Sequence, residues 1–123
     1  MFRKLALASL LTTLALPALA ADMLGARTVA YGTDTDIITV PGLQLYRQVR
    51  FCVSQRDLHM QDVDVHFGNG GHDDLWVRNV VPAGQCTRWI DLNGPARNIT
   101  SIVLRYDAVD NYGPHPIVTA EGR

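Results

Sequence analysis

The sequence predicts an all-β fold, namely an antiparallel β-sandwich of about seven or eight short strands. Short segments in which apolar and polar residues alternate recur along the chain, and clusters of Gly, Pro, Asn and Asp separate them. After residue 20, no window shows the 3.6-residue apolar period of an amphipathic helix. Strands with one apolar face must cover that face with a second sheet. We therefore expect a sandwich rather than a barrel.

The most readable stretch spans residues 85–106 and contains two alternating arms. Ile90 and Leu92 share one face of the first arm, and the second arm repeats the alternation. The intervening residues, 93–97, include Asn, Gly and Pro, which favour a turn. We therefore predict a hairpin whose apolar face packs on another sheet.

The cleanest alternation lies at residues 59–67, where Val63 and Val65 point to one side and the polar residues between them point to the other. A glycine-rich loop follows at residues 68–74. The other predicted strands occupy residues 24–31, 37–40, 45–54, 75–81 and 117–120.

The first twenty residues have the pattern of a secretory signal peptide. Arg3 and Lys4 precede an apolar run, and residues 18–20 form an A-x-A cleavage site. The run is shorter than the about 20 residues that span a bilayer, which argues against a membrane anchor. No Cys follows it, so we do not expect a lipoprotein. We predict cleavage after Ala20, a periplasmic or secreted protein, and one β-sandwich domain at residues 21–123 without a transmembrane segment.

The charge balance argues against a nucleic-acid partner. The chain has 11 basic and 12 acidic residues, and removal of Arg3 and Lys4 leaves 9 minus 12, a net charge of −3. A mildly acidic chain without basic clusters lacks the positive surface that contacts phosphates.

The two cysteines, Cys52 and Cys86, predict one disulfide in an oxidising compartment. Such a bridge contributes about 3–4 kcal/mol in the chain-entropy model. A reactive thiol is the alternative. Cys52 is out of phase with its apolar neighbours Phe51 and Val53. The bridge then lies on the less apolar strand face, or ties a strand to the loop before Trp89.

Several short motifs resemble those of one family. They are Leu24-Gly25, V-x-F-x-N-G at residues 65–70, A-G-x-x-T-R at residues 83–88, W-I-D-L at residues 89–92 and R-x-I-x-x-I-x-L at residues 97–104. Together they resemble the small exported bacterial proteins of unknown function typified by the enterobacterial YaaI protein. The resemblance covers nearly all of the chain after residue 20. It implies an envelope or secreted protein, and it supplies no activity and no catalytic residues.

Catalysis is not expected. After residue 20 the chain has only two serines, Ser54 and Ser101, and neither lies in a G-x-S-x-G motif. Sugar hydrolysis needs two carboxylates at a defined separation. The chain has many aspartates, and the sequence does not show which two would form such a pair. We expect no enzyme activity, no catalytic residue and no cofactor, because nucleophile, base and oxyanion donors cannot be assigned.

A metal site is a more specific chemical hypothesis than catalysis. Asp62, Asp64 and His66 share one strand face, and His72 lies in the following loop with two aspartates. These ligand types suit zinc or calcium. Residues two apart on a strand are about 6.5 Å apart, however, which is too far for all three to surround one ion. An exposed polar face with cross-strand Asp–Arg pairs explains the same residues, and we favour it.

Aromatic residues suggest a binding surface. Trp76 and Trp89 alternate with aliphatic residues, so both are predicted to point outward. An exposed aromatic ring can stack on a sugar or anchor a protein partner. Tyr46 and Tyr112 would extend such a surface. In the alternative, the rings cover a sheet edge or lie under a loop.

Three functional hypotheses follow for an exported, non-catalytic protein. The first is an envelope accessory or protein-interaction module. The second is a carbohydrate-binding module that uses the tryptophans, and the third is a metal-binding protein that uses the Asp/His strand. The predicted partner is accordingly a protein or a glycan in the cell envelope.

Overall fold

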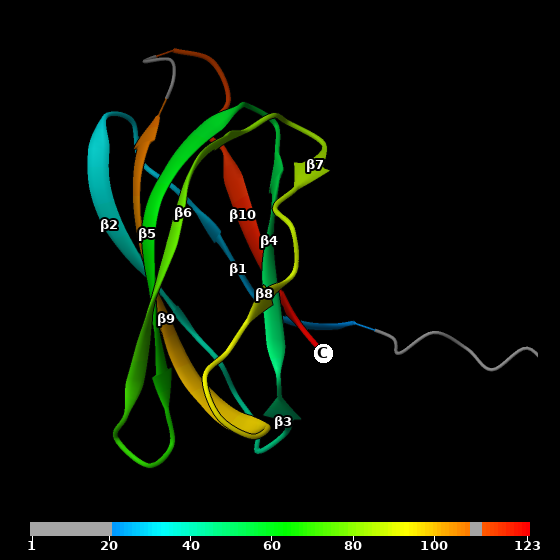
Figure 1. Cartoon of the computed structure of the whole chain (residues 1–123). Coiled ribbons are helices and arrows are strands. Elements are labelled where there is room, and N and C mark those ends of the chain that lie inside the picture. Colours follow the sequence, from blue (N-terminus) through cyan, green and yellow to red (C-terminus); the bar gives the residue numbers. More distant parts are fainter. Residues whose placement is uncertain (1–20, 109–111) are drawn as a thin grey trace, which may run out of the picture.

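The computed structural model describes residues 21–108 and 112–123. The predicted signal peptide therefore lies outside the described residues. The described part is built from ten strands and contains no helix able to cross a membrane. Two antiparallel sheets pack face to face, which confirms the predicted all-β sandwich (Figure 1).

The first sheet, called the β4 sheet, has the strand order β1-β10-β4-β7, and β8 also pairs with β4. Its central strand β4 pairs with β10 along one edge and with the two short strands along the other. The strands are β1 (Asp22–Thr28), β4 (Gln48–Ser54), β7 (Gln85–Cys86), β8 (Ile90–Asp91) and β10 (Ile117–Gly122).

The second sheet, called the β5 sheet, has the order β2-β9-β5-β6, and β3 also pairs with β9. Among the described strands, β6 pairs only with β5 and thus forms one edge of this sheet. The strands are β2 (Thr33–Thr39), β3 (Leu45–Tyr46), β5 (Leu58–Phe67), β6 (His72–Val81) and β9 (Arg97–Ala108).

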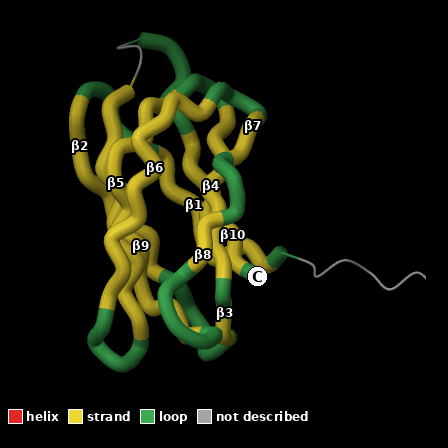
Figure 2. Tube along the Cα trace, in the orientation of Figure 1, coloured by secondary structure: helices red, strands yellow, loops and turns green. Residues whose placement is uncertain are grey.

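The core lies between the two layers, with the loops gathered at the ends (Figure 2). Phe51 of β4 and Val63 and Val65 of β5 are fully buried, whereas Asp62 and Asp64 on the same strand β5 are partly exposed. This is the alternation that the sequence predicts for residues 59–67. It leaves the outer face of the β5 sheet polar.

The predicted hairpin at residues 85–106 is wrong. β8 pairs with β4 in one sheet, whereas β9 pairs with β2 and β5 in the other. The connection at residues 92–96 therefore crosses from layer to layer (Figure 1). Alternation identifies a strand with one buried face, but both sheets bury such faces in the same core. The pattern consequently does not select the pairing partner.

The predicted single strand at residues 45–54 is also interrupted. Tyr46 pairs with Arg97 of β9 in the β5 sheet. The residues from Gln48 onward form β4, which pairs with β8 in the β4 sheet. At the switch, the backbone N–H groups of Arg47 and Gln48 both donate to the carbonyl of Arg123, at 2.9 and 3.0 Å. The chain thus passes between sheets within one extended segment.

The sandwich closes tightly where β1 meets β2. The β1–β10 register shifts between Met23 and Gly25. A Cβ atom on Gly25 would lie 2.5 Å from Cγ2 of the buried Ile38 on β2. Only a residue without a side chain fits this approach of the two layers.

Candidate binding face

Trp76 lies on the outer face of the β5 sheet, on its edge strand β6. Its neighbours Leu75 and Val77 are buried, while the Trp76 side chain is 65% exposed. The ring points outward, as the alternation of residues 75–81 predicts. An indole this exposed is unusual, because burying an aromatic side chain removes a large apolar area from water.

Arg78 and Asp62 hold a fixed arrangement around Trp76. The guanidinium carbon of Arg78 lies 4.3 Å from the centroid of the Trp76 ring. Nε of Arg78 donates to a carboxylate oxygen of Asp62 at 3.1 Å, and Asp62 is the cross-strand neighbour of Trp76. The hydrogen bond and the charge of Asp62 raise the pKa of Arg78. Trp76, Arg78 and Asp62, here called the Trp76 cluster, thus form one cross-strand unit.

A β-bulge adjoins the Trp76 cluster. Met60 pairs with Asn79 and Asp62 with Trp76, so two residues of β6 oppose one residue of β5. Arg78 has a φ of 44°, in the left-handed region that residues other than glycine rarely adopt. Bulges of this kind interrupt a ladder near sheet edges and redirect side chains.

A second group on the same face joins one aspartate to two histidines. One carboxylate oxygen of Asp64 lies 3.0 Å from Nε2 of His66, and the other lies 2.9 Å from Nδ1 of His72. The two imidazole rings stack with centroids 5.5 Å apart. His72, predicted in a loop, is in fact the first residue of β6.

The residues of the predicted metal site are thereby divided. Asp62 pairs with Arg78, away from the Asp64–histidine group. Asp73, predicted in a loop, lies in β6 and is buried, and it accepts hydrogen bonds from the backbone and side-chain N–H groups of Asn93 at 2.8 and 3.1 Å. Within residues 21–108 and 112–123, no group of three or more His, Cys, Asp or Glu side chains is arranged to hold a metal ion.

Ser101 lies near the histidine group without joining it. It is directly opposite His66 in the β5–β9 ladder, and His66 in turn contacts Asp64. These are the residue types of a hydrolytic triad, but no hydrogen bond connects the Ser101 hydroxyl to His66 in the described structure. A nucleophile needs such a contact to its base.

Trp89 lies in the connection between β7 and β8, next to the β4 sheet, and is half-buried. The guanidinium carbons of two arginines lie close to the centroid of its ring, that of Arg50 at 4.6 Å and that of Arg123 at 4.2 Å. Arg50 also pairs with Glu121 at 2.6 Å. The two tryptophans therefore belong to opposite layers and do not form one surface.

The two predicted tyrosines lie elsewhere again. Tyr46 is buried, so it cannot extend an exposed aromatic surface; its hydroxyl donates to Asp22 at 2.9 Å. Burial, together with Asp22, raises the pKa of Tyr46 to about 12. Tyr112 is exposed in the loop before β10. The guanidinium carbon of Arg56 lies 4.9 Å from the centroid of its ring.

The disulfide predicted from the cysteine count is present. Cys52 of β4 and Cys86 of β7 are directly opposite each other, with Cα atoms 3.9 Å apart. Cys52 alternates with the buried Phe51 and Val53, so the bridge lies on the less apolar face of β4. It fastens the segment between β6 and β8 to the sheet.

A model of one protein family matches residues 5–120, nearly the whole chain. The chain belongs to the DUF2541 family. The family is described as a domain of unknown function, so the match carries no activity. No curated protein and no solved structure matches the chain. The likeness to the YaaI protein stays a prediction.

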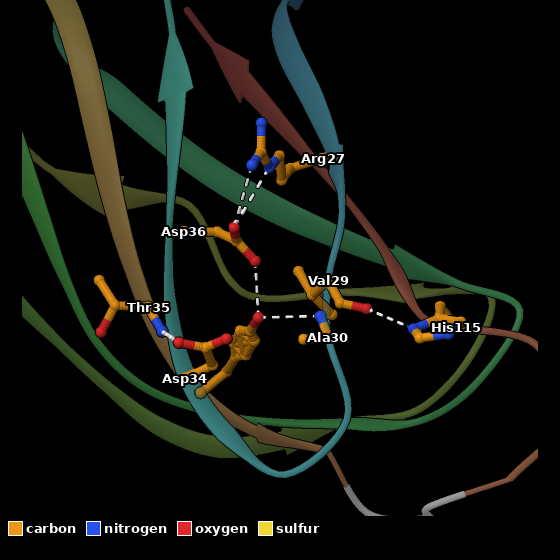
Figure 3. A network of polar contacts seen from close by, with 8 residues as sticks. Arg27, Val29, Ala30, Asp34, Thr35, Asp36 and His115 are labelled. Atoms are coloured by element: carbon orange, nitrogen blue, oxygen red, sulfur yellow. Dashed lines mark hydrogen bonds and ion pairs between the residues drawn. The ribbon is translucent and has the colours of Figure 1, made fainter.

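The DUF2541 domain also contains a partly buried polar network that the sequence pattern does not indicate. The Tyr106 hydroxyl donates to Asp36 at 2.6 Å and accepts from the backbone N–H of Ala30 at 2.9 Å. The other carboxylate oxygen of Asp36 contacts Arg27 at 3.2 Å (Figure 3). Burial, and secondly the bond to Asp36, raises the pKa of Tyr106 to about 12. The network joins β1, β2 and β9 and is structural.

Two shallow cavities lie away from the Trp76 cluster. One, of about 450 Å³, is lined by Arg47, Gln48, Asp91, Leu92, Gly94 and Arg123. The other, of about 490 Å³, lies among the loops around Phe67 and Arg97. Neither is lined by Trp76 or by the Asp64–histidine group. The arrangement around Trp76 therefore suits a partner that lies against a sheet surface.

Proposed function

We propose that this DUF2541 domain is an exported, non-catalytic protein-interaction module of the cell envelope, whose partner contacts the β5 sheet at the Trp76 cluster. The single observation that carries the proposal is the 65% exposed side chain of Trp76, with Arg78 stacked on its ring.

The chemistry of the Trp76 cluster matches that of protein-interface hot spots. Trp and Arg are the residue types whose truncation most often weakens protein interfaces. The Arg78 side chain is already ordered by Asp62 and by the indole ring. Binding then loses less side-chain entropy than it would with a free arginine.

A non-catalytic role is supported by the geometry of the polar groups. Among the residues that the structure describes, Ser101 has the only hydroxyl side chain directly opposite His66, and no hydrogen bond joins the two. The histidine group also lines neither of the two shallow cavities described above.

Export is supported by two independent features. The first twenty residues have a basic start, an apolar run and an A-x-A site. The Cys52–Cys86 bridge is of the kind that forms in oxidising compartments such as the periplasm.

Glycan binding is the second candidate, because an exposed indole ring is also a platform for a sugar. Arg78 already occupies a position over that ring, which favours the protein partner. A thermal melt against a glycan panel separates the two. A glycan at 100 times its dissociation constant stabilises the native state by about 2.7 kcal/mol, a shift of several degrees. That shift, lost in Trp76→Ala, would support the glycan.

Site-specific photo-cross-linking in the native host tests the proposal. A cross-linking residue replaces Val80, which is 52% exposed on β6. A matched position, Thr28, is exposed on β1 of the other sheet. We expect an adduct with one identified envelope protein from position 80 and none from position 28. Identical adducts from both positions would contradict the proposal.

A further inference from the structure

Strand β6 has backbone groups that no other strand satisfies. The N–H of Phe67 donates to the carbonyl of Gly71, and the carbonyl of Phe67 accepts from Gly70, so the backbone groups of Phe67 face β6. In an antiparallel ladder this orientation recurs at every second residue. The β5–β6 hydrogen bonds therefore fall on the pairs Val65–Asp73 and Val63–Leu75.

The residues between those pairs face the other way. His72, Asp74 and Trp76 direct their N–H and C=O groups away from β5, toward the open edge of the sheet. In the described part of the chain, no backbone hydrogen bond joins these three residues to another segment. The edge thus presents one donor and one acceptor on each of three alternate residues, which is a template for an added strand.

The open edge is limited to residues 72–76. The bulge at Arg78 interrupts the regular spacing directly after Trp76. Asp74 is thus the central residue of the open edge, and its side chain is exposed. A second copy of the chain, pairing antiparallel about this centre, would place one Asp74 directly opposite the other. Like charges in directly opposite positions destabilise a sheet, so self-pairing is disfavoured.

The same charge favours a different strand. We propose that residues 72–76 accept an extended segment of the partner protein as an added antiparallel strand, with a Lys or Arg opposite Asp74. This inference rests on the proposed function and specifies how the partner docks. In strand addition the backbone supplies affinity and the alternate side chains supply specificity. β-Branched residues two positions before and two positions after that cation would lie opposite His72 and Trp76.

A peptide titration tests the docking mode. The blocked peptide Thr-Val-Thr-Lys-Thr-Val-Thr and its counterpart with Glu in place of Lys are titrated into the ¹⁵N-labelled protein. We expect the largest amide shifts at His72, Asp74 and Trp76. We also expect about fivefold tighter binding of the Lys peptide, since one cross-strand charge pair contributes up to about 1 kcal/mol. Equal affinities, or no binding of either peptide, would overturn the inference.

Three variants sharpen the test. Asp74→Lys should reverse the preference between the peptides. Asp34→Lys makes the same charge change at an exposed position of β2, the opposite edge strand, and should leave both affinities unchanged. Asp74→Pro removes an open-edge donor but no β5–β6 hydrogen bond, and should abolish binding of both. If Asp34→Lys and Asp74→Lys change the peptide affinities in the same way, the change comes from the net charge of the protein and the inference fails.

The two proposals fail separately. If the peptides do not bind while the cross-link from position 80 persists, the strand-addition mode is wrong and the interaction module stands. If the peptides bind at the open edge while no site-dependent cross-link forms in the host, the proposed function is wrong.

Discussion

The guanidinium group of Arg78 lies over the indole ring of Trp76, with 4.3 Å between the guanidinium carbon and the ring centroid. Asp62 fixes that guanidinium from the neighbouring strand at 3.1 Å. All three side chains stand on the outer face of the β5 sheet, where they contribute little to the core. Residues that are ordered but outside the core are candidates for function, because packing does not require them.

Replacement of Trp76 should separate function from stability. Trp76→Ala should change the free energy of unfolding by less than about 1 kcal/mol, since the side chain is largely exposed. Leu75→Ala, at the adjacent buried position, should cost about 2–5 kcal/mol. Urea unfolding of the two variants checks this. A large loss in Trp76→Ala would mean that the ring is part of the core.

The disulfide should be a major source of stability. A Cys52→Ala/Cys86→Ala double variant should lose about 3–4 kcal/mol, because the bridge no longer limits the unfolded chain. Urea unfolding with and without a reductant measures the loss in the wild type, and the reductant should not affect the double variant. A loss below about 1 kcal/mol would show that β7 contributes to stability without its bridge, and that the bridge is not a major source of stability.

Buried tyrosines should make the fold sensitive to alkali. The pKa values of Tyr46 and Tyr106 are both raised to about 12 in the folded chain, against about 10 when unfolded. The unfolded chain therefore loses these protons first, so the contribution of the two tyrosines to stability should be fully present below pH 10 and fall as pH rises from 10 to 12. Tyr106→Phe should show a shallower fall. An unchanged pH dependence in that variant would exclude Tyr106 as a cause.

Asp73 should be needed for the connection between the sheets. Its carboxylate accepts two hydrogen bonds from Asn93, in the segment that crosses from β8 to β9. Asp73→Ala should cost about 1–3 kcal/mol, because it removes the hydrogen bonds that hold the crossing segment to a charged, buried carboxylate. Asp74→Ala, at the next and exposed position, serves as the control in the same thermal melts. Equal effects of both changes would contradict the assignment.

The close approach of β1 and β2 should exclude a side chain at Gly25. Gly25→Ala places Cβ against the branched side chain of Ile38 and should cost about 1–3 kcal/mol. In an Ile38→Ala background the clash is removed, so the same change should cost less. A double-mutant cycle measures the difference. Strict additivity would mean that the two residues do not interfere.

The sequence predicts the strands far better than it predicts their partners. Alternation at Val63 and Val65 correctly identified the buried face of β5, and alternation at Trp76 correctly placed that ring outside. These are local properties of one strand. The partners of β8 and β9 are non-local, and the amphipathic pattern is the same whichever sheet receives the strand. The hairpin prediction failed for that reason.

The composition of the site was predictable only in part. The sequence predicts Asp–Arg pairing on an exposed strand face, and Asp62 with Arg78 is such a pair. The bulge at Arg78 and the burial of Asp73 and Tyr46 depend on long-range register and on loops that cross the core. The Tyr106–Asp36 bond joins residues that are distant in the chain and has no local signal.

The most direct test of the account measures the yield of the position 80 cross-link in three backgrounds: the wild type, Trp76→Ala and Trp76→Phe. We expect one envelope-protein adduct in the wild type, its loss in Trp76→Ala and its partial retention in Trp76→Phe, because an aromatic ring anchors the partner. An adduct of unchanged yield in Trp76→Ala would contradict the claim that Trp76 forms the binding face.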